Sequence, residues 1–262
     1  MENNIPRLAT PISHLFKDEE NARKIINASD CLECRDHGFE KDYDNQEVFH
    51  CELQPIHQLK EEQFDYLEKL KIKKPELKLI SFHLASCFDA PVIKNGRFVP
   101  GGNKLSRSTL LANAQKNFTR IKEIFGPDIM IAVENNNHYK TEAYDYITLP
   151  DFISEVVNQN DIHFLFDIAH ARISAVNQGV SFEDYVNRLP INRLVQIHIS
   201  RPGYNDIGEI IDKHELPADE EIAEVLEILK NNHKVKYLTV EYYKDTDVLV
   251  ELLKIVKQKI NG

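Results

Sequence analysis

Acidic and imidazole side chains stand directly after apolar runs in this chain. The run FLFD ends in Asp167, and His170 follows three residues later. An acid and an imidazole next to a buried strand are costly unless another group compensates them. A divalent cation compensates both, since carboxylate oxygen and neutral imidazole nitrogen are ordinary metal ligands. The pair by itself fits a metal site, and equally a capping aspartate beside a histidine that is bonded to a carbonyl group.

The same arrangement recurs along the chain, which favours the metal site. The other ligand-type residues at or just after the end of an apolar run are His50, His83, Glu134, His198, Asp212, His214 and Glu241. The register of the third expected strand is open, so His57 competes with His50 for the first of these places. A purely structural metal site closes its coordination shell with four ligands. Nine candidates therefore predict a catalytic centre.

Length and composition are those of a water-soluble α/β protein. The 262 residues suit one barrel, which typically needs about 250, and the apolar and charged fractions of 42% and 28% are ordinary. No apolar run approaches the ~20 residues of a membrane span, and the N-terminus lacks a signal-like pattern. We expect a cytoplasmic protein without a membrane partner. The net charge of −10 makes a nucleic-acid partner unlikely.

Cys31 and Cys34 form a CxxC pair inside an expected strand. Residues three apart in a strand point to opposite faces of the sheet. No second CxxC is present to complete a zinc site. The four cysteines of the chain are therefore predicted to be small core residues.

Alternating strands and helices predict the fold. Strands are expected at residues 7–13, 30–35, 46–53, 76–84, 129–134, 162–167, 193–200 and 235–241. Helices are expected at residues 17–29, 59–74, 110–125, 149–159, 181–189, 217–232 and 246–260. Alternation of this kind implies parallel strands, and eight of them predict a single (β/α)8 TIM-type barrel domain over residues 1–262. A doubly wound open sheet is the alternative. The barrel also explains why the ligand-type residues follow strand ends, because barrel active sites are built there.

The segment from Ala85 to Lys104 is long and contains several prolines and glycines. A connection of this length is more typical of a functional lid than of a passive link. Lys94, Arg97, Lys104 and Arg107 form a local basic cluster in this acidic protein. We therefore expect the segment to cover an anionic or peptide substrate.

The series of ligand-type residues resembles the metal site of the xylose-isomerase-like TIM barrels, which include endonuclease IV and sugar isomerases and epimerases. Within that superfamily the chain is most similar to the multinuclear non-heme iron-dependent oxidative enzymes, a group that includes the methanobactin-type peptide-modifying oxidase. The sequence segments that carry this resemblance are ENNNHY, the strand ending in FD, ISAVNQGVSFEDYVNRLPINRLVQIHIS and IIDKHELP. The resemblance runs from about His50 to Glu241.

Two departures from that oxidative group are visible. Its paired asparagines after the sixth-strand aspartate are replaced here by Ile168, Ala169 and His170, and its second histidine after the seventh strand is replaced by SRPG. The Asp-x-x-His and Asp-x-His pairs instead resemble endonuclease IV.

The resemblance implies a division of the ligands among two or three divalent ions. Glu134 would bridge two metals, of which one is also held by His50 and His83. The other would be held by Asp167, His198 and Glu241, and a third by His170, Asp212 and His214. Iron is the metal that the resemblance favours; imidazole and carboxylate ligands suit zinc and manganese as well.

The resemblance further implies an iron-dependent oxidative enzyme that modifies a peptide substrate at cysteine with dioxygen. Glu134, Asp167 and Glu241 are its expected catalytic residues. Arg172 and Arg201, which follow proposed ligands, are expected either to bind an anionic substrate or to pair with neighbouring acids. The substrate is a peptide or a small molecule, with a partner protein that presents it as a further option. A metal-dependent phosphodiesterase of endonuclease IV type and a sugar isomerase or epimerase are the alternatives.

Overall fold

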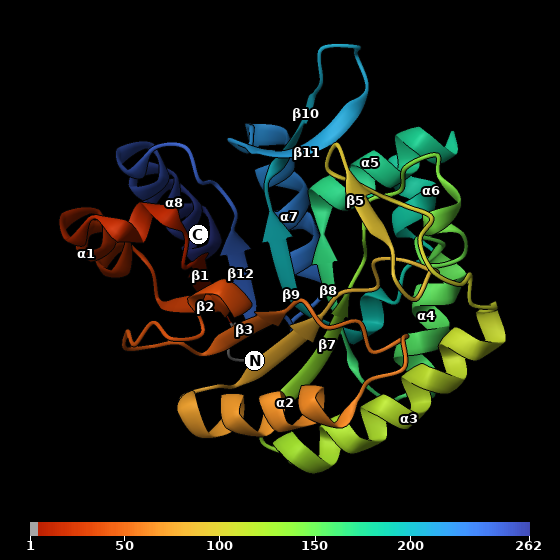
Figure 1. Cartoon of the computed structure of the whole chain (residues 1–262). Coiled ribbons are helices and arrows are strands. Elements are labelled where there is room, and N and C mark those ends of the chain that lie inside the picture. Colours follow the sequence, from red (N-terminus) through yellow and green to blue (C-terminus); the bar gives the residue numbers. More distant parts are fainter. Residues whose placement is uncertain (1–4) are drawn as a thin grey trace.

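Eight parallel strands close into a barrel in the computed structural model, which describes residues 5–262 (Figure 1). β1 pairs with β12 on one side and with β2 on the other, so the sheet has no free edge. This closure confirms the predicted barrel and excludes the open sheet. The barrel strands are β1 (Arg7–Pro11), β2 (Cys31–Arg35), β3 (Val48–Cys51), β4 (Leu79–Phe82), β7 (Met130–Glu134), β8 (His163–Asp167), β9 (Leu194–Ile199) and β12 (Tyr237–Val240).

Helices surround the barrel and bury one apolar side against it. In α3, for example, Leu110, Ala114, Phe118, Ile121 and Phe125 recur at helical spacing and are buried. The helices are α1 (Glu19–Ala28), α2 (Glu61–Lys73), α3 (Arg107–Phe125), α4 (Pro150–Gln159), α5 (Ile168–Gln178), α6 (Phe182–Val186), α7 (Asp219–Asn231) and α8 (Thr246–Asn261). Short 3-10 turns are η1 (His14–Lys17), η2 (Asp36–Gly38), η3 (Glu142–Tyr144) and η4 (Ile191–Arg193). No helix in the described part of the chain is both long and apolar enough to cross a bilayer.

The sequence did not predict α5: the one helix expected between β8 and β9 was a short one at residues 181–189. Small and apolar residues occupy most sides of α5, and seven of its eleven residues are buried, so it has no polar face to reveal its period. Asp167 caps the helix by accepting a hydrogen bond from the backbone N–H of His170 at 2.7 Å. His170 therefore lies in the first turn of a helix and not in an irregular turn.

Two antiparallel hairpins extend the fold beyond the barrel (Figure 1). β5 (Val92–Lys94) and β6 (Arg97–Val99) form one hairpin inside the expected lid segment. β10 (Arg201–Tyr204) and β11 (Ile210–Glu215) form the other. Asp212 and His214, which no expected strand or helix includes, therefore lie on a strand. Arg97 of β6 forms an ion pair with Glu209, which ties the two hairpins together.

An apolar layer fills the barrel toward the N-terminal ends of its strands. One buried residue from each strand contributes to it: Ala9, Cys31, Val48, Leu79, Ala132, Leu165, Val195 and Tyr237. All four cysteines of the chain are buried and unpaired, as expected for core residues. We call these eight residues the floor, because they close the barrel interior at the N-terminal ends of the strands.

The same strands carry polar side chains nearer to their C-terminal ends, two positions after the floor residues. Side chains at i and i+2 face the same side of a strand. Ala132 is thus followed by Glu134, Leu165 by Asp167, and Val48 by His50. Glu134, Asp167 and His50 point into the barrel because the floor residues two positions before them do.

We predict that Leu79→Ala destabilises the fold by about 2–5 kcal/mol, because it leaves a cavity in the floor at a site with no exposure. Urea unfolding followed by circular dichroism measures the change. Ile72→Ala, at an exposed site on α2, is the control and should change the free energy of unfolding by less than about 0.5 kcal/mol. Equal changes in the free energy of unfolding for the two variants would contradict the stabilising role of the apolar layer.

Candidate metal centre

The first group of donor atoms comes from the ends of β3, β4 and β7. His50 Nε2 lies 3.4 Å and His83 Nδ1 lies 3.2 Å from Oε2 of Glu134. Two donors bound to one metal at ~2.1 Å in tetrahedral geometry stand about 3.4 Å apart. The three side chains can therefore hold one ion without moving far.

The second group shares the other oxygen of Glu134. His198 Nδ1 lies 3.3 Å from Glu134 Oε1, 3.4 Å from Glu241 Oε1 and 3.9 Å from Asp167 Oδ2. These four side chains lie at the C-terminal ends of β7, β8 and β9 and directly after β12. Glu134 faces one group with each of its oxygens, which is the geometry of a bridging carboxylate.

The third group combines α5, the β10–β11 hairpin and the end of β12. Nε2 of His170 and Nε2 of His214 each lie 3.4 Å from Asp212 Oδ2. His214 Nε2 also lies 3.4 Å from Glu241 Oε2. Glu241 thus faces the second group with Oε1 and the third with Oε2. The sequence predicted one bridging carboxylate, Glu134, and Glu241 also faces two groups. Within the described residues the donor atoms of the first two groups lie close enough together to hold an ion, whereas those of His170, Asp212 and His214 are more widely spread.

Three polar atoms at the middle of these groups are buried without a hydrogen-bond partner in the described structure: Glu134 Oε2, Asp167 Oδ2 and His198 Nδ1. A buried polar atom left unsatisfied costs about 1–3 kcal/mol, and more when it is charged. Each of the three atoms faces other ligand-type atoms across the distances given above. Metal ions would satisfy all three, so the residues fit the predicted cofactor.

Glu33 orients His198 from behind. His198 Nε2 lies 2.9 Å from Glu33 Oε2, so the imidazole donates its Nε2 proton and leaves Nδ1 free as a ligand. Gln196 and Thr239 also donate to Glu33, at 2.8 and 3.2 Å. Glu33 is close enough to be a ligand with His198 and Glu241, yet its oxygens are occupied by these donors and by Arg35. We assign it a supporting role.

Arg35 and Tyr243 orient the carboxylate of Glu241, as Glu33 orients the imidazole of His198. The guanidinium group of Arg35 contacts Glu33 and Glu241, and the Tyr243 hydroxyl donates to Glu241 Oε1 at 3.1 Å. The sequence predicted no role for Glu33, Arg35 or Tyr243. The signal that could have found the first two is the inward period of β2, since Cys31, Glu33 and Arg35 alternate along it.

Hydrogen bonds also occupy one nitrogen of two other imidazoles. His50 Nδ1 lies 2.7 Å from Ser81 Oγ, which leaves Nε2 for the first group. His170 Nδ1 lies 3.0 Å from the Asn135 carbonyl oxygen, which leaves Nε2 for Asp212. A metal-bound histidine commonly has such a partner on its other nitrogen.

Burial and crowding shift the proton affinities of the cluster. Burial, together with the nearby carboxylates Glu134 and Glu241, raises the pKa of Asp167 to about 7. Burial and the neighbouring His83 lower the pKa of His50 to about 4. Neutral imidazole is the form that binds metal, and a cation would favour ionisation of the carboxyl group.

Other predicted residues lie outside the cluster. His57 Nε2 lies 2.8 Å from the Ser86 carbonyl oxygen, so His50 and not His57 joins the centre. Arg172 forms ion pairs with acids of α7, at 2.7 Å from Glu224, which is the non-catalytic alternative for this residue. Arg201 is exposed on β10.

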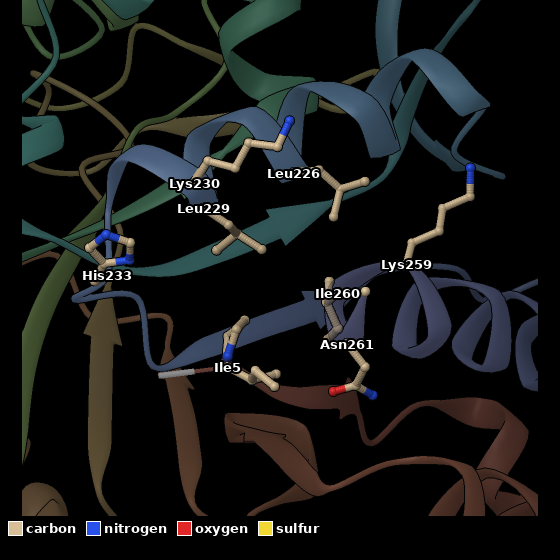
Figure 2. Close-up of a pocket in the computed structure, with 10 residues that line it drawn as sticks. Ile5, Leu226, Leu229, Lys230, His233, Lys259, Ile260 and Asn261 are labelled. Carbon is tan, nitrogen blue, oxygen red and sulfur yellow. The ribbon is translucent and has the colours of Figure 1, made fainter. Parts of the chain in front are cut away.

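A cavity of about 380 Å³ lies at the opposite end of the barrel (Figure 2). It is lined by Ile5 and Pro6 before β1 and by the C-terminal parts of α7 and α8. None of the nine ligand-type residues lines it. It is therefore separate from the candidate metal centre.

The fold and the grouped donors define a TIM barrel with a candidate multinuclear metal site. The model of the family described as RiPP precursor modification enzyme MbnB/TglH/ChrH matches residues 53–260. The chain belongs to this family, whose members modify precursors of ribosomally made peptides.

Curated relatives match shorter stretches. A UPF0276 protein of Acaryochloris marina is 29% identical over 100 residues, which is 38% of this chain and 35% of that protein. A UPF0276 protein of Vibrio vulnificus is 25% identical over 131 residues, 49% of this chain and 45% of that protein. The matches thus span between a third and a half of the relatives' length.

Solved structures share the fold. 3-Keto-D-glucoside 4-epimerase YcjR from E. coli has a TM-score of 0.63 at 12% identity and covers 97% of this chain and 99% of that one. D-Psicose 3-epimerase from Clostridium cellulolyticum H10 has a TM-score of 0.57 at 11% identity, with 97% and 98% covered. A xylose isomerase-like TIM barrel protein from Mycobacterium smegmatis in complex with magnesium has a TM-score of 0.51 at 11% identity, with 95% and 79% covered. The barrel is therefore of the xylose-isomerase-like type, as predicted.

We predict that His50→Ala removes one metal ion per chain, because it takes a donor from the first group. Elemental analysis after anaerobic reconstitution measures the loss. His57→Ala is the matched control and should keep the wild-type metal content. A loss in the His57 variant alone would show that the third strand is misregistered.

We also predict that Glu33→Gln weakens metal binding by about 10–100-fold, as is common when the partner of a metal-bound histidine is removed. Competition with a chelator of known affinity measures the change. Glu52→Gln, at an exposed site just after β3, is the control. An unchanged affinity in Glu33→Gln would exclude the supporting role.

Proposed function

We propose that this protein is an oxidative enzyme with two or three iron ions that modifies a peptide substrate at cysteine with dioxygen. The observation that carries the proposal is the arrangement of nine donor residues in three groups that share Glu134 and Glu241, in a chain that belongs to a family of peptide modification enzymes. The peptide substrate follows from the family. The donor arrangement supports a multinuclear centre.

The charge of the centre supports an anionic ligand such as a cysteine thiolate. Its carboxylates are Glu134, Asp167, Asp212 and Glu241, whose four negative charges are fewer than the positive charge of three divalent ions. The surplus favours deprotonation of a bound thiol. The buried carboxylate Glu33 is paired with Arg35, so these two residues leave that surplus unchanged.

The cluster is more open on one side than on the other. His50, Glu134, Asp167 and His198 have side chains at most 3% exposed, whereas those of His83 and His214 are 28% and 27% exposed. A substrate cysteine would therefore approach past these two histidines. The two hairpins joined through Arg97 and Glu209 lie on the same end of the fold and would shield the peptide from water.

The chain's own residues would divide the work. Glu134, Asp167 and Glu241 would fix the ions relative to one another, and the hydroxyl group of Tyr243 would steady Glu241. Bound iron would supply the redox chemistry that no side chain of the site provides, with dioxygen as the oxidant. We also propose that the enzyme acts in the cytoplasm and that a partner protein presents the peptide to it.

Lewis-acid chemistry is the second candidate, because the structural neighbours with this fold include sugar epimerases. A sugar isomerase or epimerase, or a phosphodiesterase of endonuclease IV type, would need a metal only to polarise a carbonyl or phosphoryl group. Zinc or manganese would then be a sufficient cofactor. The third donor group, with His170, Asp212 and His214, exceeds the need of a mononuclear isomerase.

We predict that peptide oxidation requires both ferrous iron and dioxygen, whereas zinc loading abolishes it because zinc is redox-inert. Apo-protein loaded with iron or with zinc is assayed, with and without air, for dioxygen consumption with cysteine-containing peptides. Cleavage of abasic DNA and epimerisation of ketoses are measured in parallel. An active zinc form together with an iron form that consumes no dioxygen would exclude the oxidase.

A further inference from the structure

A second cavity, of about 520 Å³, lies beside the metal centre and is basic. Its lining includes His14 and Lys17 from η1, Arg35 from β2, His37 from η2, and Lys41. No aspartate or glutamate lines it. Such a concentration of positive charge is unexpected in a chain with a net charge of −10.

Its two lysines are available to a ligand. Lys17 and Lys41 are exposed, and neither forms an ion pair with another described residue. Two of the acids beside them in sequence have other contacts, since Asp18 caps α1 and Glu40 pairs with Lys73. The third, Asp42, is exposed beside Lys41 and does not line the cavity. Arg35 is paired with Glu33 and Glu241, so the positive charge that is left for a ligand comes from Lys17 and Lys41.

The cavity adjoins the candidate metal centre through two shared residues. Arg35 and Tyr243 line it, and both contact Glu241, the carboxylate between the second and third donor groups. A molecule bound in the cavity would be separated from that carboxylate by a single side chain. Pro11 and Ile12 are buried and give the cavity an apolar wall against which aliphatic carbons can pack.

We propose that this basic cavity binds a carboxylate group of the peptide substrate, which anchors the peptide while its cysteine reaches the metal centre. The peptide nature of the ligand rests on the proposed function; the preference for an anion rests on the cavity alone. Acidic side chains and the C-terminal carboxylate offer the same chemistry to Lys17 and Lys41. The overall negative charge of the protein would disfavour binding of an acidic peptide to most of its surface.

The test is a direct binding measurement on the metal-loaded protein, without any assay of activity. Amidated hexaglutamate and hexaglutamine that carry an uncharged BODIPY dye are titrated at low ionic strength and followed by fluorescence polarisation. A third probe, hexaglutamine with a free C-terminus, separates the terminal carboxylate from side-chain carboxylates. The double variant Lys17→Glu/Lys41→Glu reverses the charge of the cavity at exposed sites where folding is not at risk.

The matched control is Lys69→Glu/Lys116→Glu, at exposed sites on α2 and α3, which changes the net charge by the same amount. We expect an anionic probe to bind the wild type, to lose at least about tenfold in affinity in the cavity variant, and to change less than about twofold in the control. Equal losses in both variants, no loss in either, or no binding of any anionic probe would overturn the proposal. Because no turnover is measured, failure of the oxidase assay would leave this result interpretable.

Discussion

Four carboxylate and five imidazole groups meet at one end of the barrel, and most of them are withdrawn from water. Glu134, Asp167 and Glu241 are almost fully buried within a few ångströms of one another. Bringing ionised carboxylates this close in a low-dielectric interior is strongly unfavourable unless positive charge accompanies them. Arg35 supplies one such charge, and metal ions would supply the rest. The arrangement of the whole interior depends on this requirement.

The barrel meets the requirement through its layers. The apolar floor residues Ala132, Leu165 and Val48 point into the barrel. Because side chains two positions apart share a face of a strand, Glu134, Asp167 and His50 point into the barrel as well. Glu33, held by Gln196 and Thr239, accepts the Nε2 proton of His198 and so directs Nδ1 of that ring toward Glu134 and Glu241. The third donor group differs because two of its ligands lie on the β10–β11 hairpin, outside the barrel wall. Its geometry therefore depends on how that hairpin is held.

The sequence predicted the barrel and the meeting place of the nine residues, because apolar runs and strand ends are local patterns. Metal binding by these residues stays a prediction. α5 could not be found locally, since burial on most sides removes the amphipathic pattern. The role of Glu33 depends on closure of the barrel, which brings it to His198 across 165 residues of chain. The ion pair of Arg172 with Glu224 likewise depends on the packing of α5 beside α7.

The most direct test of a multinuclear centre is an anomalous difference map from crystals of protein purified and loaded with ferrous iron in the absence of air. Data collected on both sides of the iron absorption edge locate each ion and identify it. The account predicts separate peaks between His50 and Glu134, between Glu134 and Glu241, and between Glu241 and Asp212. A single peak, or peaks away from Glu134 and Glu241, would contradict it.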